Sequence, residues 1–332
     1  MQAIRIHAHG GPEQLRWEEV PIAPPGPGEA RVRHTAIALN FSDVNVRRGG
    51  FYRPEPLPMP LIPGNEAAGV VTALGPGVTA VKPGDRVGYV GTGGAFYENT
   101  GAYAEERNLP AERLVPIPDG ISDEQAAAVM MKGLTAAGII DRIFTPQPGD
   151  PVLIHAAASG VGLLLTSWAH HLGATVIGTV GSPDKARIAA EHGCAVPILY
   201  RETDFVAAVR AVVPEGVAAV FDGVGKDTFI PSLDCTRPFG MLVNYGNASG
   251  HVPPLDLLLL AQKGSLSVCR PGVHYYLGHP ERFRGVVGRV FDLVAAGAIR
   301  PRIGQRWPLR DAAEAHRALE AGGTAGSSVL LP

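Results

Sequence analysis

This 332-residue chain is short of cysteine and has no excess of positive charge. Its three cysteines, Cys194, Cys235 and Cys269, are odd in number and are never spaced as CxxC. That pattern argues against a disulfide framework and a four-cysteine zinc cluster, and it is typical of a reducing cytosol. Charged residues make up 18% of the chain and the formal net charge is −2, so no global positive field attracts nucleic acid or an anionic membrane. We expect a small-molecule ligand instead.

Long apolar runs are also missing. The opening residues MQAIRIHAHGGPEQL lack the apolar core of a signal peptide. The run from Leu255 to Ala261 is too short to span a bilayer, and it contains Asp256. We therefore expect a soluble, cytoplasmic protein that does not enter a membrane.

The length favours two domains, since ~150 residues per domain is usual. In the first third, turn sequences such as PPGPGE and KPGD separate short apolar or alternating runs, which predict a small, mostly antiparallel β domain. These runs are Ala3 to His7, Ala30 to Ile37, Glu66 to Leu74 and Asp85 to Tyr89. The amino-acid composition then changes. The segment SDEQAAAVMMKGLTAAGII is rich in Ala and predicts a helix. Ser122 is its expected N-cap, with Gln125 as the capping-box partner.

Apolar runs alternate with helical segments from Pro151 to Tyr245, which predicts a parallel, doubly wound sheet. The first βαβ unit contains the turn HAAASGVG, where a dinucleotide-binding fold has its glycine-rich loop. At the three glycine positions of the fingerprint GxGxxG the chain has Ala157, Ser159 and Gly162, so only the third glycine is retained. We expect the two Cβ atoms to crowd a pyrophosphate or shift it toward the helix, and the Ser159 hydroxyl to compensate with a hydrogen bond.

No carboxylate follows the second strand of this unit. Between Gly173 and Pro183 there is no Asp or Glu to hold the 2′-hydroxyl of an adenosine ribose, and Lys185 stands just beyond. Ser182 can share the contact with a 2′-phosphate, and we expect Asp184 to face solvent near the positive end of the helix dipole. The pattern favours NADP(H) over NAD(H).

Twelve segments resemble one known family over nearly the whole chain. They are HGGPEQL, NFSDVNVRRGGFY, PGNEAAGVV, KPGDRV, MKGLTA, HAAASGVG, GTVGSPDK, YRETDF, FDGVGKDT, YGNASG, QKGSLSVCRP and GSSVLLP. Together they resemble the zeta-crystallin-type quinone oxidoreductases of the medium-chain dehydrogenase/reductase superfamily. The resemblance implies a GroES-like catalytic domain of residues 1–121 and 268–332, and an inserted Rossmann domain of residues 122–267 that binds NADPH. It also implies an active site in the cleft between them, and a homodimer whose Rossmann sheets join edge to edge.

The zinc enzymes of this superfamily have a Cys ligand where this chain has Asn40, and a His ligand where it has Asn65. Glu66 remains, but one carboxylate cannot build a three-ligand catalytic site. The four-cysteine structural loop is absent as well. We therefore expect no metal, which suits a quinone because that acceptor is already electrophilic and the protein mainly aligns two rings.

By matched position, the resemblance implies that Asn40, Asp43, Tyr52 and Thr135 surround the nicotinamide and the acceptor. Asn40 would hydrogen-bond a cofactor hydroxyl or the substrate oxygen, Thr135 would touch the nicotinamide edge, and Tyr52 would stack on a quinone or donate to it. For Asp43 a structural role in the turn stays open. The implied cofactor contacts also include Ala158, Ser159, Gly160, Val161 and Gly162 in the turn, Gly181, Ser182, Lys185 and Tyr200 at the adenosine end, and Tyr245, Gly246, Asn247 and Arg270 from the last strands.

Three functions stay open at this point. The first is NADPH-dependent reduction of quinones, by hydride or by stepwise electron transfer. The second is reduction of an enone or enal double bond, which needs a proton donor near the α-carbon, with Tyr52 as the candidate. The third is a non-catalytic crystallin-like or RNA-binding role, and the lack of a basic stripe argues against RNA. Asn45, Asn65 and Gly50 depart from some bacterial relatives beside the implied acceptor pocket and leave the acceptor undecided.

The cofactor preference can be tested at Lys185. Replacing it with Ala removes the charge expected to face the 2′-phosphate, so Lys185→Ala should weaken binding of NADPH far more than binding of NADH. Fluorescence titration with both nucleotides measures the two dissociation constants. Equal losses for the two would contradict the assignment.

Overall fold

The computed structural model describes residues 1–49, 57–91 and 100–332. They form two compact units. The first unit comprises Met1–Leu134, Val273–Ala295 and Pro301–Pro332, and the second comprises Thr135–Gly272 and Ala296–Arg300. The division falls inside helix α2 (Asp123–Arg142), whereas the sequence placed it at 121/122 and 267/268. The naming of these units as catalytic and nucleotide-binding domains stays a prediction.

The second unit contains a six-stranded sheet in which every neighbouring pair is parallel. Its strand order is β10-β9-β8-β11-β12-β13, so the strands run 3-2-1-4-5-6 in chain order, which is the doubly wound order. The order reverses between β8 and β11, and ligands of such sheets bind beyond the carboxyl ends of the strands at this switch point. The strands are β8 (Pro151–Ile154), β9 (Thr175–Val180), β10 (Cys194–Leu199), β11 (Val217–Asp222), β12 (Thr236–Asn244) and β13 (Ser267–Cys269).

Four helices of this unit begin at a polar side chain that accepts a backbone N–H. Ser159, Ser182, Asp204 and Asp256 cap α3, α4, α5 and α7 in this way. All six residues of β11 are buried, as is typical of a parallel strand covered on both faces. The helices are α3 (Gly160–His171), α4 (Pro183–Glu191), α5 (Phe205–Val212), α6 (Phe229–Leu233) and α7 (Leu257–Gln262).

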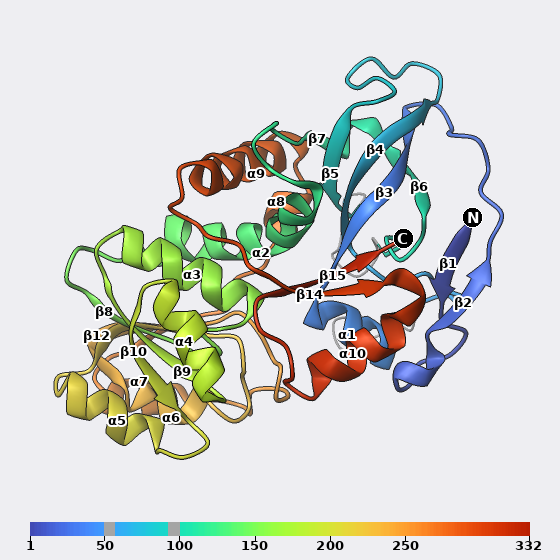
Figure 1. The fold of residues 1–332 in the computed structure, drawn as a ribbon. Helices are drawn as coiled ribbons and strands as arrows, with labels where there is room; N and C mark the ends of the chain where they lie inside the picture. The colour runs from blue at the N-terminus through green and yellow to red at the C-terminus, as the bar shows by residue number, and fades with distance from the viewer. Residues whose placement is uncertain (50–56, 92–99) are drawn as a thin grey trace. The chain divides into compact units, whose positions relative to one another are not determined.

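The first unit is built on a seven-stranded, mainly antiparallel sheet. Its main path runs β14-β15-β3-β4-β5-β7, with β6 paired to β3, and β1 and β2 form a separate two-stranded sheet. The last strand, β15, pairs with β3 near the N-terminus, so both ends of the chain share this sheet (Figure 1). The strands are β1 (Gln2–Arg5), β2 (Arg16–Glu19), β3 (Glu29–Leu39), β4 (Glu66–Leu74), β5 (Arg86–Val90), β6 (Glu106–Pro110), β7 (Val115–Pro116), β14 (Ile303–Pro308) and β15 (Ser327–Leu331).

The predicted capping box at the start of α2 is confirmed. The backbone N–H of Ser122 donates to the Gln125 side chain at 3.1 Å, and the N–H of Gln125 donates to the Ser122 hydroxyl at 3.2 Å. Arg86 of β5 bonds Asp123 and thereby joins the helix start to the sheet. The other helices of this unit are α1 (Phe41–Arg48), α8 (His274–Leu277), α9 (Pro280–Ala295) and α10 (Ala312–Glu320). Over the described ranges, every helix is too short or too polar to cross a membrane.

Candidate functional site

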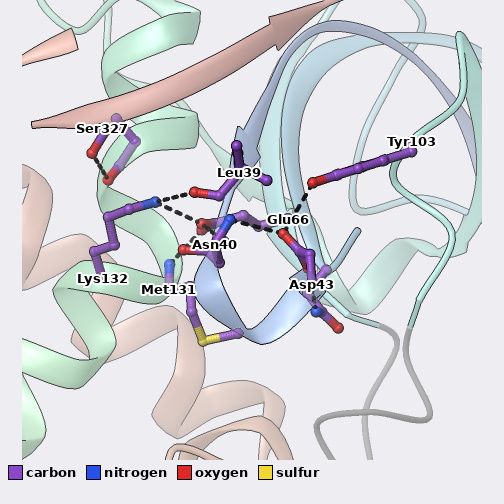
Figure 2. Close-up of polar contacts among 10 residues, drawn as sticks. Leu39, Asn40, Asp43, Glu66, Tyr103, Met131, Lys132 and Ser327 are labelled. Carbon is purple, nitrogen blue, oxygen red and sulfur yellow. Dashed lines mark hydrogen bonds and ion pairs between the residues drawn. The ribbon is translucent and has the colours of Figure 1, made fainter. Parts of the chain in front are cut away.

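Two buried carboxylates, Asp43 and Glu66, organise the polar interior of the first unit (Figure 2). Strand β3 ends at Leu39, and Asn40 then takes an extended conformation as the N-cap of α1. This places Asp43 in the first turn of α1, while Glu66 is the first residue of β4. Both carboxylates are fully buried, so their charge or their protons must be balanced by groups of the protein.

Asp43 accepts three hydrogen bonds. Its Oδ2 accepts from the backbone N–H of Asn40 at 2.8 Å and from the Tyr103 hydroxyl at 3.3 Å, and its Oδ1 accepts from the Asn65 amide at 2.9 Å. Burial raises the pKa of Asp43 to about 7, and the hydrogen bonds from Asn40 and Asn65 act against that rise. Asp43 therefore supports the turn that carries Asn40, and a direct part in chemistry stays a prediction.

Glu66 joins three segments of the chain. Its Oε1 accepts from the Asn40 amide at 2.6 Å, and its Oε2 accepts from the backbone N–H of Met131 at 2.5 Å. The ammonium of Lys132, on the same turn of α2, donates to Oε1 at 3.5 Å and to the Leu39 carbonyl at 3.4 Å. Burial raises the pKa of Glu66, and the charge of Lys132 opposes that rise. The amide of Asn40 is thus oriented by Glu66.

This set of donors does not fit a zinc ion. The amide of Asn40 and the ammonium of Lys132 both point N–H groups at Glu66, whereas zinc needs lone pairs from His, Cys or carboxylate. The Asn65 amide likewise donates to Asp43. Within the described ranges, no three His, Cys, Asp or Glu side chains are grouped so as to hold a metal. The residues at these positions serve each other as hydrogen-bond partners.

A chain of hydrogen bonds leads from Asp43 to helix α10. Burial and the charge of Arg47 lower the pKa of His316 to about 3, so His316 is neutral. Its Nδ1 accepts from Arg47 at 3.4 Å, which leaves Nε2–H to donate to the Tyr103 hydroxyl at 3.0 Å, and Tyr103 then donates to Asp43. Glu320 pairs with Arg47 at 2.7 Å. Sequence reasoning missed this chain because its members lie far apart in the sequence.

The turn HAAASGVG of the second unit differs from the expectation in one respect. Ala157 is fully buried, and a Cβ added at Gly178 would lie 2.6 Å from its methyl group, so that methyl points into the protein and not toward a bound pyrophosphate. The predicted crowding by Ala157 was therefore wrong. Ser159 caps α3, and its hydroxyl oxygen accepts from the N–H of Gly162 at 3.0 Å. A Cβ at Gly162 would lie 2.2 Å from the Ala156 carbonyl oxygen, which explains why this glycine is retained.

The residues expected at the adenosine end gather at the carboxyl ends of β9 and β10. Ser182 caps α4 and accepts from the N–H of Lys185 at 3.4 Å. Partial burial lowers the pKa of Lys185, and so does the positive charge of Arg201. A Cβ at Gly181 would lie 3.2 Å from the Tyr200 hydroxyl and 3.4 Å from Arg201 Nε. Arg201 was not among the predicted residues, although it directly follows Tyr200 in the sequence.

The residues expected from the last strands lie together beyond β12 and β13. Arg270 donates to the carbonyl of Gly246 at 3.1 Å and to the side chain of Asn247 at 3.2 Å. The backbone N–H of Tyr245 donates to the Asp222 carbonyl at 2.8 Å. Asp222 was not among the residues singled out from the sequence. Its position at the end of an apolar run was the signal that could have identified it.

Tyr52 and Thr135 are the remaining residues predicted to surround the nicotinamide and the acceptor. Tyr52 lies outside the described residues. Thr135 is half-buried on α2 and belongs to the second unit, whereas Asn40 and Asp43 belong to the first. The predicted roles of Asn40, Asp43, Tyr52 and Thr135 toward a nicotinamide or an acceptor stay predictions.

Comparison with known proteins places these features in a family. Residues 26–119 match the family "Alcohol dehydrogenase GroES-like domain", and residues 160–292 match "Zinc-binding dehydrogenase". A quinone oxidoreductase of Pseudomonas aeruginosa is 46% identical over 99% of both chains. A 2-haloacrylate reductase of a Burkholderia species is 42% identical over 100% of this chain and 99% of its own. The structure of an Escherichia coli quinone oxidoreductase complexed with NADPH matches with a TM-score of 0.92 at 40% identity, covering both chains fully. The predicted fold, a GroES-like domain with a Rossmann sheet, is confirmed.

Burial of Asp43 predicts a pH dependence of stability. Its pKa rises from 3.8 to about 7 on folding, so the folded state takes up a proton in this range. The stabilisation is complete below pH 3.8 and is lost as the pH rises toward 7. Between these limits we expect the free energy of unfolding of the wild type to fall by on the order of 4 kcal/mol relative to that of Asp43→Asn.

Urea unfolding at several pH values measures this difference. The variant keeps its partners, because Asn65 can rotate its amide and present Oδ1, which has no hydrogen-bond partner among the described residues. Asp119→Asn, at an exposed turn, is the matched control and should follow the wild type. Parallel pH profiles for the wild type and Asp43→Asn would refute the assignment.

Proposed function

Because the chain belongs to the quinone oxidoreductase family of the medium-chain dehydrogenase/reductase superfamily, we propose that it reduces quinones with NADPH and without a metal. Relatives named quinone oxidoreductase are 46%, 42% and 41% identical to it over 99% of its length. The doubly wound sheet with a capped α3 at its first crossover supports the dinucleotide part of this proposal.

The observation that carries the choice of NADPH is the pair of cations, Lys185 and Arg201, beside Gly181. Like charges brought close together disfavour each other, and a dianionic phosphate between them would relieve that repulsion. Ser182 adds a hydroxyl at the same place, and Asp184 is exposed on the first turn of α4. These groups would hold the 2′-phosphate of NADPH.

The pyrophosphate would rest on the first turn of α3. Gly160 and Val161 would present their backbone N–H groups there, at the positive end of the helix dipole, and Gly162 would lie beside them with its own N–H bonded to Ser159. Because Ser159 already accepts from Gly162, its hydroxyl hydrogen stays available to donate to a phosphate oxygen. Tyr245, Gly246, Asn247 and Arg270 would border the nicotinamide half. Bound NADPH supplies the hydride, and these residues bind and orient it.

The acceptor would be oriented by the amide of Asn40, which Glu66 holds in place. A quinone needs no metal to polarise its carbonyl, and the cationic Lys132 beside Glu66 keeps this region from carrying a net negative charge that would oppose hydride transfer. Tyr52 and Thr135 remain the other proposed contacts. The amide and the ammonium therefore stand in for the electrostatic role that zinc has in other members of the superfamily.

A second candidate function is reduction of an activated carbon–carbon double bond. The 2-haloacrylate reductase at 42% identity favours it, because its substrate is an electron-poor alkene by name. Such a reaction needs the same hydride and, in addition, a proton at the α-carbon, for which Tyr52 is the proposed donor. The two candidates differ in the acceptor and share the cofactor.

We also infer a cytoplasmic homodimer joined at the edge strand β13. The three cysteines are unpaired, which suits a reducing compartment. Val268 on β13 is 36% exposed, and Leu257 and Leu258 on the preceding α7 are 74% and 60% exposed. An exposed edge strand flanked by apolar side chains is suited to pairing with a second copy.

The proposed function is tested by following NADPH oxidation with a panel of quinones and enones, repeated with NADH. We expect turnover of quinones with NADPH. In Arg201→Met the loss of one phosphate contact should raise the KM for NADPH about tenfold, the effect of ~1.4 kcal/mol, and leave that for NADH unchanged. Glu202→Gln, at the neighbouring exposed position, is the control. Turnover of enones alone would favour the second candidate, and binding of NADPH without any turnover would overturn both.

The dimer is tested by changing its edge. Lysine on an edge strand opposes pairing with another strand, so Val268→Lys should give a species of 34.8 kDa in sedimentation equilibrium, where the wild type gives twice that mass. Val212→Lys places the same charge on another exposed valine, at the end of α5, and should remain dimeric. A wild type that sediments as a monomer at micromolar concentration would refute the dimer.

A further inference from the structure

Buried polar side chains line the carboxyl ends of three adjacent strands of the Rossmann sheet. His155 follows β8, Asp222 ends β11 and Asn244 ends β12, and their exposed fractions are 0%, 0% and 4%. The strand order reverses between β8 and β11, so this row of side chains lies directly beneath the proposed cofactor site. The mechanism above uses none of them.

His155 has a hydrogen-bond partner on each ring nitrogen. Its Nε2 lies 2.8 Å from the Ser232 hydroxyl, and its Nδ1 lies 3.0 Å from the Thr179 hydroxyl. Phe205 packs edge-on against the ring, with the centroids 5.0 Å apart. Burial lowers the pKa of His155, and the carboxylate of Asp222, the charged group that acts on it, opposes this. The ring is therefore neutral and carries one hydrogen.

The neighbouring groups determine which nitrogen carries that hydrogen. The single hydroxyl hydrogen of Ser232 is donated to the Thr228 carbonyl at 2.6 Å, so Ser232 must accept from His155. This puts the hydrogen on Nε2 and leaves Nδ1 to accept from the Thr179 hydroxyl. The Thr179 oxygen in turn accepts the backbone N–H of Ala156 at 3.3 Å. All of these hydrogen bonds run in one direction, from the nucleotide turn to Thr228.

The same network continues to the other half of the cofactor site. Thr228 donates its hydroxyl to Asp222 Oδ1 at 2.8 Å, and Asn244 donates to Asp222 Oδ2 at 3.2 Å. Arg270 then bonds the carbonyl of Asn244 at 3.2 Å and the side chain of Asn247. The turn proposed to hold the pyrophosphate and the segment proposed to border the nicotinamide are thus linked through side chains that are buried except for the half-buried Thr228 and the exposed Arg270.

Ala156 is the point where this network acts on the backbone. Its φ is +51°, in the left-handed region that residues with a Cβ seldom adopt. Its N–H is bound by Thr179, and its carbonyl accepts from the N–H of Ser159 at 2.8 Å, which starts the turn into α3. The Thr179 hydroxyl therefore helps to stabilise the left-handed backbone conformation of Ala156, which is otherwise unfavourable for a residue with a Cβ.

We propose that His155, as its Nε2–H tautomer, is a positioning residue that holds the turn of residues 156–162 in the conformation that receives the pyrophosphate. The inference rests on the proposed binding of NADPH. His155 acts through Thr179 on Ala156 and through Ser232 and Asp222 on the segment near Asn247. It touches neither cofactor nor substrate.

The experiment compares two ligands in the 332-residue chain. NADPH engages the turn through its pyrophosphate, whereas adenosine 2′-monophosphate lacks a pyrophosphate and engages only the end near Lys185 and Arg201. We expect Thr179→Val, which removes the hydroxyl at constant shape, and His155→Phe to raise the dissociation constant for NADPH about tenfold. Both variants should bind adenosine 2′-monophosphate with a dissociation constant within about twofold of the wild-type value. Thr179→Ser keeps the hydroxyl and should bind NADPH like the wild type.

The outcomes separate this proposal from the proposed function. If His155→Phe binds both ligands like the wild type, or loses both equally, His155 does not position the turn, whatever Thr179→Val does. If the wild type itself fails to bind NADPH, the proposed function fails first. A ¹⁵N–¹H correlation across the imidazole ring of the wild type adds a readout independent of ligand, because a hydrogen on Nδ1 would contradict the assigned direction of the network.

Discussion

The fold depends on buried carboxylates whose hydrogen-bond donors must all come from the protein itself. A carboxylate without hydrogen-bond partners is costly inside a protein, so each buried one recruits donors from several segments. In the first unit, Glu66 at the start of β4 accepts hydrogen bonds from Asn40, which follows β3, and from Met131 on α2. Asp43 likewise accepts from the backbone of Asn40, the N-cap of α1, and from Tyr103. The position of Asn40, the residue proposed to meet the acceptor, follows from these two groups.

The second unit uses the same principle around Asp222. Its Oδ1 accepts from the N–H groups of Val224 and Gly225 at 2.8 Å and 3.1 Å and from the Thr228 hydroxyl, so one carboxylate shapes the turn after β11. Parallel strands bring their carboxyl ends to one edge, and polar residues there can bond across neighbouring strands. Networks of this kind are rigid when every member is satisfied, which suits a site that must present backbone N–H groups to a ligand.

Residues 160–292 match a family described as "Zinc-binding dehydrogenase", yet Asn40 and Asn65, at the positions where the zinc enzymes have ligands, bond Glu66 and Asp43 instead. Replacing ligands by Asn40 and Asn65 leaves amides that both donate and accept, and the surrounding carboxylates then become their partners. Lys132 supplies a positive charge beside Glu66. This arrangement suits the proposed acceptors, because quinones and activated alkenes are electrophilic without a Lewis acid.

Local features of this protein were determined by the sequence alone. The capping box at Ser122, the first βαβ unit, the retained Gly162 and the missing ribose-binding carboxylate all depend on residues close together in the chain, and simple rules of capping and turn geometry apply to them. Only the tertiary structure decided the rest. Arg201 beside Lys185, the inward methyl of Ala157 and the chain from Arg47 through His316 to Asp43 join distant segments. Which buried side chain meets which partner depends on how strands and helices pack, and spacing along the sequence does not contain that information.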